Sequence, residues 1–179
     1  MQSISRFILF KLMRWKIEGN FPFDLKKYVI IVAPHTHWID FFMGLLIRSA
    51  TGLKANYIGK ASLFKGPFGF VFKATGGAPV DRSKSTNKVD SIVQLFNSKE
   101  EFVLSLSPEG TRKKVEEWKT GFYYIAKGAN VPIVRVVFDF EHKLIRILSP
   151  FYTTDNKELD FIELRSVYKG VKGKIPKYS

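Results

Sequence analysis

The sequence predicts an α/β fold, a single domain in which helices flank a mixed, mostly parallel sheet. The period of the apolar residues switches repeatedly between about two and about 3.6 along the 179 residues, so strands alternate with helices. The hydrophobic fraction is 45% and includes 17 Phe, which is enough for one packed core and excludes a disordered chain. No internal repeat or linker divides the chain.

Residues 4–17 have the spacing of a helix with two apolar sides, one containing Phe7 and the other Phe10. Two apolar sides suit a helix that lies between its own domain and a membrane interface. The alternative is a terminal helix that packs entirely on its domain. We therefore expect an N-terminal interfacial helix within residues 1–20 and the main domain over residues 21–179.

The remaining elements follow from the apolar period and from breakers and caps. Strands are expected at 28–33, 56–59, 78–80, 102–106, 132–140 and 144–147. Helices are expected at 40–50, closed by Gly52, and at 67–74, 86–97, 120–127, stopped by Gly128, and 158–168. The last two strands are joined by a short polar turn and form a hairpin, which makes the sheet mixed.

The charge balance limits the possible partners. Lys and Arg number 29 against 16 Asp and Glu, a net charge of +13, which indicates an anionic partner such as nucleic acid, lipid headgroups or a phosphorylated substrate. The tail 165–179 is basic throughout and is expected either to fray in solvent or to contact an anionic membrane.

The absence of certain features from the sequence excludes other classes. The chain has no cysteine, which excludes disulfides, zinc–thiolate sites and a thiol nucleophile. It has neither a signal-peptide pattern nor an apolar run of about 18 residues, so a cytoplasmic protein without a spanning helix is expected.

The stretch APHTHWIDFF contains the first candidate site. His35 follows a predicted buried strand, and Asp40 lies five residues later at the start of a helix, where it can reach back to the imidazole. Such a pair can act as a general base on a substrate hydroxyl, with the carboxylate holding the ring. Two other interpretations are a structural histidine and a metal site that uses His35, His37 and Asp40, for which the only further histidine is His142.

Three strand-end loops present cations. The turn SPEGTR is expected to expose Glu109, Thr111 and Arg112, and Arg offers a planar fork that fits a phosphate. Arg82 and Lys60 follow two other short strands. If these loops meet the His35 loop at one edge of the sheet, they would hold a phosphorylated ligand beside a base.

Four short blocks in order make the chain resemble the lysophosphatidate acyltransferases of the glycerolipid acyltransferase superfamily. The blocks are His35 with Asp40, Gly76-Gly77 to Arg82, Glu109-Gly110-Thr111-Arg112, and Val131-Pro132-Ile133. The resemblance implies a glycerol-3-phosphate acyltransferase-like fold. It differs at Ser62, where relatives often have Glu, and in the short N-terminal region.

The resemblance also implies a reaction and its partners. His35, oriented by Asp40, would activate the free hydroxyl of a lysophospholipid, 1-acyl-glycerol-3-phosphate first, for attack on the thioester of acyl-CoA or acyl carrier protein, giving phosphatidate. Lysolipids with other headgroups are alternative acceptors. No metal or other cofactor is implied, and the enzyme would sit peripherally on the inner face of the membrane.

The residues of the other blocks would bind the two substrates. Lys60, Arg82, Glu109, Gly110, Thr111 and Arg112 would bind the glycerol-phosphate group, and Pro132 and Ile133 would shape the acyl pocket.

Two other classes of protein fit the sequence less well. A basic module that binds an anionic membrane or nucleic acid explains the charge, but no nucleic-acid-binding signature is present and no nucleic acid is expected. A hydrolase lacks support because no Gly-x-Ser-x-Gly, His-Glu-x-x-His or P-loop pattern occurs.

Overall fold

The computed structural model describes residues 2–80 and 88–179, with the side chains of residues 59–61, 63, 79 and 80 left out of the description. The strands are β1 (Lys16–Glu18), β2 (Lys27–Ala33), β3 (Asn56–Lys60), β4 (Gly77–Val80), β5 (Phe102–Leu106), β6 (Ile133–Asp139) and β7 (Leu144–Ile147). The helices are α1 (Gln2–Arg6), η1 (Phe7–Leu12), α2 (Ile39–Thr51), α3 (Ala61–Lys65), α4 (Gly69–Ala74), α5 (Lys88–Ser98), α6 (Gly121–Ala129), α7 (Lys157–Ser166) and η2 (Pro176–Tyr178).

The strands of the described chain form one sheet of seven in the order β1-β7-β6-β2-β5-β3-β4. Every neighbouring pair is parallel except β6 and β7, which form the expected hairpin. The predicted mixed, mostly parallel α/β sheet is therefore confirmed.

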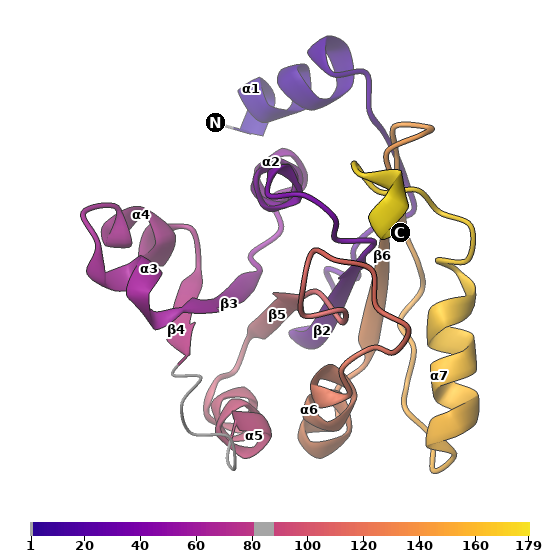
Figure 1. Ribbon diagram of the computed structural model, residues 1–179. Coiled ribbons are helices and arrows are strands. Elements are labelled where there is room, and N and C mark those ends of the chain that lie inside the picture. The colour runs from indigo at the N-terminus through magenta and orange to yellow at the C-terminus, as the bar shows by residue number, and fades with distance from the viewer. Residues whose placement is uncertain (1, 81–87) are drawn as a thin grey trace.

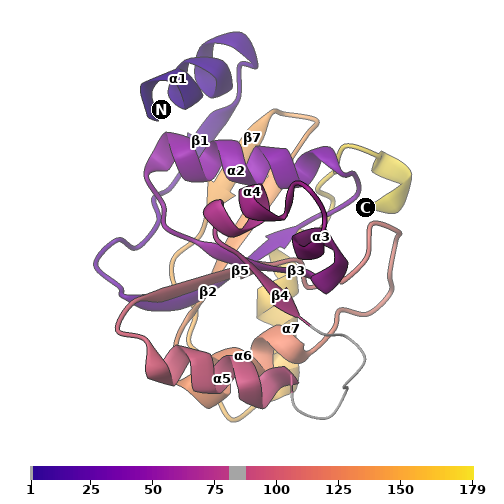
Figure 2. The same ribbon diagram turned by 90° about the vertical axis from the view of Figure 1, so that its left-hand side faces the viewer.

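Helices cover both faces of this sheet (Figure 1). α2 lies on one face with α1 beyond it, and α5, α6 and α7 lie on the other side. Side chains of β2 pack alternately on the two faces of the sheet. Tyr28 and Ile30 belong to one apolar cluster, and Val29 and Ile31 belong to the other. Figure 2 shows α2, α4 and α3 together on the face that is turned toward the viewer.

The N-terminal segment differs from the predicted helix over 4–17. The helical part ends at Leu12, Arg14 adopts a left-handed backbone with φ of 59°, and the next residues form β1, which pairs with β7. Leu9 and Trp15 are buried in the core. The apolar spacing was real, but part of it belongs to a strand that completes the sheet edge.

Three smaller differences concern helices. α3 was not predicted, and α6 continues past Gly128 to Ala129, where Asn130 adopts the left-handed cap. The tail contains η2 and lies against the rest of the fold, so the expectation that it frays is wrong, whereas the alternative of contact with an anionic membrane stays a prediction. Across the described residues, no helix combines the length and the apolar character of a membrane span.

Candidate active site

The site lies where the parallel strands end. β2, β3, β4, β5 and β6 run in the same direction, so their carboxyl ends meet at one edge of the sheet, the usual position of sites in α/β folds. His35 follows β2 at this edge, and the loop that contains Glu109 follows β5. The topology thus brings together two of the sequence blocks.

His35 and Asp40 form a direct pair. Nδ1 of His35 lies 3.0 Å from Oδ2 of Asp40, and the same oxygen accepts the backbone N–H groups of Thr36 at 2.9 Å and His37 at 2.8 Å. The Asp40 side chain is 3% exposed and the His35 side chain 26%. A buried carboxylate with these donors favours the tautomer that is protonated at Nδ1, so Nε2 is the ring nitrogen that can accept a proton.

Glu109 lies on the other side of His35, and here the prediction of an exposed carboxylate is wrong. Its side chain is buried, and Oε2 accepts the backbone N–H of His35 at 2.7 Å and the hydroxyl of Ser107 at 3.3 Å. Burial raises the pKa of Glu109 above its ordinary value, partly offset by the hydrogen bond from His35. Glu109 therefore fastens the β5 loop to the His35 loop.

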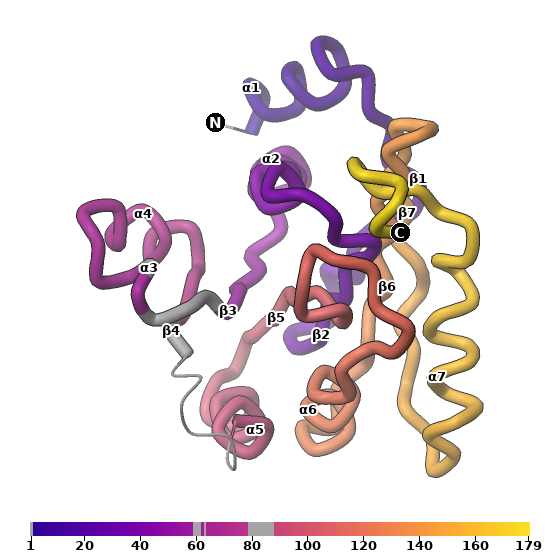
Figure 3. Tube along the Cα trace, viewed as in Figure 1, coloured from indigo at the N-terminus to yellow at the C-terminus, as the bar shows by residue number. Residues whose placement is uncertain are grey.

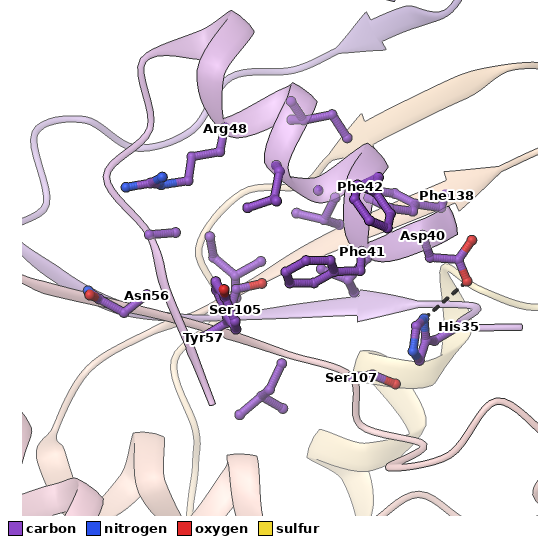
Figure 4. Close-up of a pocket in the computed structure, with 18 of the residues that line it drawn as sticks. His35, Asp40, Phe41, Phe42, Arg48, Asn56, Tyr57, Ser105, Ser107 and Phe138 are labelled. Carbon is purple, nitrogen blue, oxygen red and sulfur yellow. Dashed lines mark hydrogen bonds and ion pairs between the residues drawn. The ribbon is translucent and has the colours of Figure 1, made fainter. Parts of the chain in front are cut away.

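An elongated apolar cavity of about 600 Å³ opens beside this pair. His35 and Asp40 line it at one end, and Phe41 of α2 lines it farther along, toward Arg48 (Figure 4). Leu45 of α2 is a further lining residue. The lining is mainly apolar, and the volume falls in the usual range of ligand sites.

The other residues of the Glu109 block have different surroundings. Arg112 is exposed and lines the same cavity as His35. Gly110 has a left-handed backbone with φ of 66°, and a Cβ there would lie 2.8 Å from the Lys119 side chain. Thr111 accepts the backbone N–H of Lys113 at 3.3 Å within the turn.

Two predicted phosphate contacts can be placed only in part. Lys60 ends β3 at the same sheet edge, but its side chain is outside the described residues. Arg82, two positions after the last residue of β4 in the sequence, lies wholly outside them.

Pro132 and Ile133 are not among the residues that line the cavity. Ile133 is fully buried in the cluster on the α5–α6 side and pairs with Val29 near the start of β2, at the end of the strand away from His35. No finding tests the expected acyl-pocket role of these two residues, which stays a prediction.

Three residues of the candidate site were not predicted from the sequence. Ser107 holds Glu109, Thr36 is 2% exposed inside the His35 loop, and Arg48 lines the cavity. A helical wheel of α2 contains the signal for the cavity, since positions 41, 45 and 48 share a stripe beside the buried stripe of Met43 and Ile47.

The other histidines have ordinary partners. Nδ1 of His37 accepts the backbone N–H of Ile39 at 3.3 Å. His142 pairs with Asp139 at 2.8 Å in the β6–β7 turn. In residues 2–80 and 88–179, His, Asp and Glu side chains form no group of three suited to a metal ion.

Comparison with known proteins gives consistent matches. A family model described as acyltransferase matches residues 14–139. The 1-acyl-sn-glycerol-3-phosphate acyltransferase of Haemophilus influenzae is 30% identical over 145 residues, which are 78% of this chain and 60% of that protein. The chain therefore spans about 60% of the length of this curated relative.

The crystal structure of the 1-acyl-sn-glycerophosphate (LPA) acyltransferase PlsC from Thermotoga maritima matches with a TM-score of 0.67 and 19% identity, over 94% of this chain and 75% of that one. This likeness concerns the fold. The matched family region contains the His35–Asp40 pair, the Glu109 loop and most of the sheet, and the chain belongs to the acyltransferase family.

Proposed function

We propose that this protein is an O-acyltransferase that moves a fatty acyl group from acyl-CoA or acyl carrier protein to the free hydroxyl of a lysophospholipid. The acceptor we favour is 1-acyl-glycerol-3-phosphate, which would give phosphatidate, because the similar proteins carry that substrate in their names. The observation that carries the proposal is the His35–Asp40 pair at one end of a long apolar cavity.

The reaction follows from this geometry. Nε2 of His35 takes the proton of the acceptor hydroxyl as its oxygen attacks the thioester carbonyl, and Asp40 stabilises the imidazolium that forms. The tetrahedral intermediate collapses with cleavage of the C–S bond, and the imidazolium returns its proton to the leaving thiolate. The products are an ester and a free thiol, and no acyl-enzyme is formed.

The apolar cavity and Arg112 would bind different parts of the two substrates. The acyl chain of the donor would lie in the apolar space along α2, where the removal of each methylene from water is worth about 0.8 kcal/mol. The exposed guanidinium of Arg112 would bind the phosphate of the acceptor, with Lys60, which ends β3 at the same sheet edge, and Arg82 as further proposed contacts.

An anionic membrane surface is the third proposed partner. Phe68 and Phe70 are 69% and 71% exposed on the α3–α4 segment, and the exposed Lys65 and Lys73 flank them with no acidic residue between. The α1–η1 region adds exposed Phe7. Exposed aromatic rings among lysines complement a bilayer with anionic headgroups and support a peripheral position on the inner face of the membrane.

The test is a thiol-release assay with palmitoyl-CoA or acyl carrier protein as donor and a panel of lysolipid acceptors. His35→Ala is expected to lower acceptor-dependent thiol release by about 10²- to 10⁴-fold, as for loss of a general base. His142→Ala removes the histidine of the other His–Asp pair and serves as the matched control, with wild-type rates expected. Full activity of folded His35→Ala would reject the mechanism, and preference for another headgroup would reject only the favoured acceptor.

A further inference from the structure

The last eight residues lie against the loop that contains the catalytic pair. After α7 the chain returns toward the β2–α2 loop, and the C-terminus ends beside it (Figure 3). The backbone N–H of Phe140 donates to the carbonyl of Lys172 at 3.0 Å, and the Gly173 N–H donates to Oγ of Ser179 at 2.7 Å. We call residues 172–179 the C-terminal strap.

The strap contacts one residue of the loop with particular closeness. Thr36 is 2% exposed, and its Oγ1 accepts the backbone N–H of Ile175 at 3.0 Å, although the two residues are 139 positions apart. At Gly173, an added Cβ would lie 2.6 Å from Oγ1 and 2.7 Å from Cγ2 of Thr36. Such distances leave no room for a side chain, so the strap backbone itself packs on Thr36.

Thr36 in turn belongs to the shell around Asp40. Its backbone N–H donates to Oδ2 of Asp40, the same oxygen that faces Nδ1 of His35. Glu109 holds the adjacent peptide by accepting the N–H of His35. The loop is thus fixed by a carboxylate from the β5 side and by the strap from the other side.

We propose that the C-terminal strap, acting through Thr36, positions the His35–Asp40 pair for acyl transfer. Thr36, Gly173 and Ile175 are positioning residues, because none of their atoms needs to touch substrate for this effect. The inference rests on the proposed function for its kinetic readout. Displacement of a catalytic group by about 1 Å can lower a rate by roughly a hundredfold, so a remote contact of this kind is measurable.

The experiment compares four variants of the full chain. Thr36→Val removes the acceptor for the Ile175 N–H but keeps the shape of the side chain, and Gly173→Ala introduces the clashing Cβ. Both are expected to lower kcat roughly ten- to a hundredfold with little change in the KM of the acyl donor. Thr36→Ser keeps the hydroxyl and is expected to retain most of kcat, and Lys174→Ala, an exposed strap side chain, is the matched control.

A second readout needs no turnover. The imidazole of His35, one of only three histidines, can be followed by heteronuclear NMR in each variant, with His35→Gln for assignment. We expect the ring-nitrogen chemical shifts of His35 to change in Thr36→Val and Gly173→Ala but not in Lys174→Ala. If wild-type protein transferred no acyl group, the proposed function would fail while this measurement still tested the strap.

Two outcomes would overturn the inference. One is unchanged kcat and unchanged His35 signals in both Thr36→Val and Gly173→Ala. The other is a loss in Thr36→Ser as large as in Thr36→Val, since the hydroxyl would then not be the group that matters. Thermal unfolding of each variant, run in parallel, identifies those that remain folded at the assay temperature.

Discussion

Substituting Gly44 with a larger residue tests the proposal that the acyl chain of the donor lies in the cavity. Gly44 is inside α2, lines the cavity, and a Cβ built on it would meet nothing within 4 Å. A Cβ at this position therefore fits without displacing other atoms. Gly44→Ala is expected to stabilise the protein by about 0.5–1 kcal/mol, because glycine inside a helix costs that much relative to alanine.

Gly44→Leu should change the preferred donor. Leucine adds three carbons beyond Cβ, and if each displaces one acyl methylene, binding of a long chain loses about 2.4 kcal/mol. That loss corresponds to roughly a 60-fold lower kcat/KM for palmitoyl-CoA. An octanoyl chain short enough to stop before the new side chain should lose little, so the ratio of the two rates is the quantity to measure.

Gly121→Leu is the matched control, because Gly121 begins α6, is not among the residues lining the cavity and also has open space at its Cβ. Thiol release is measured for the two donors with each variant, alongside thermal unfolding. An equal loss with octanoyl and palmitoyl donors, or an unchanged preference for palmitoyl, would show that the chain does not run along α2.

Two further predictions concern the surface. Replacing Phe68 and Phe70 together by Ser should weaken binding to phosphatidylglycerol vesicles, measured by flotation, by at least about tenfold, because burial of each ring is worth roughly 1.5–3 kcal/mol. The control is Tyr152→Ser, which should bind normally, because Tyr152 is 60% exposed but lies near the opposite ends of the strands. Equal flotation of the two variants would contradict this placement. The second prediction concerns the pH dependence of stability. The hydrogen bond to Asp139 raises the pKa of His142. The stabilisation from this pair is therefore present below the ordinary histidine pKa of about 6.5 and is lost as pH rises through the raised pKa. The Tm loss caused by His142→Gln should therefore be larger at about pH 5.5 than at about pH 8.5, and a loss that does not depend on pH would disagree.

The elements with a clear apolar period could be predicted from the sequence. β5 was predicted at residues 102–106, and the buried strand before His35 and the helix closed by Gly52 were predicted to within one residue at each end. In these segments local pattern and tertiary environment agree, because each strand is buried on both faces and Gly52 adopts the left-handed conformation that ends a helix.

What the sequence could not give are the contacts made across the chain. Glu109 lies in a segment with the composition of an exposed turn, yet the parallel pairing of β2 with β5 brings its carboxylate to the backbone N–H of His35. The sequence of β1 has the pattern of the end of an amphipathic helix, and this segment forms a strand because it pairs with the edge of β7. Thr36 meets Ile175 from 139 residues away. Each of these depends on distant partners, which no local period encodes.

The two His–Asp pairs among the described residues show why a short His–Asp distance does not by itself predict a catalytic site. His142 and Asp139 lie 2.8 Å apart, slightly closer than the 3.0 Å of His35 and Asp40. The His142 side chain is 67% exposed in a hairpin turn, where water can replace its carboxylate partner. Asp40 is buried and receives two backbone N–H groups besides the imidazole, so its orientation is fixed before a substrate arrives. Of the two rings, only that of His35 also lines the apolar cavity, and a general base needs both a held ring and a place for the reacting group beside it.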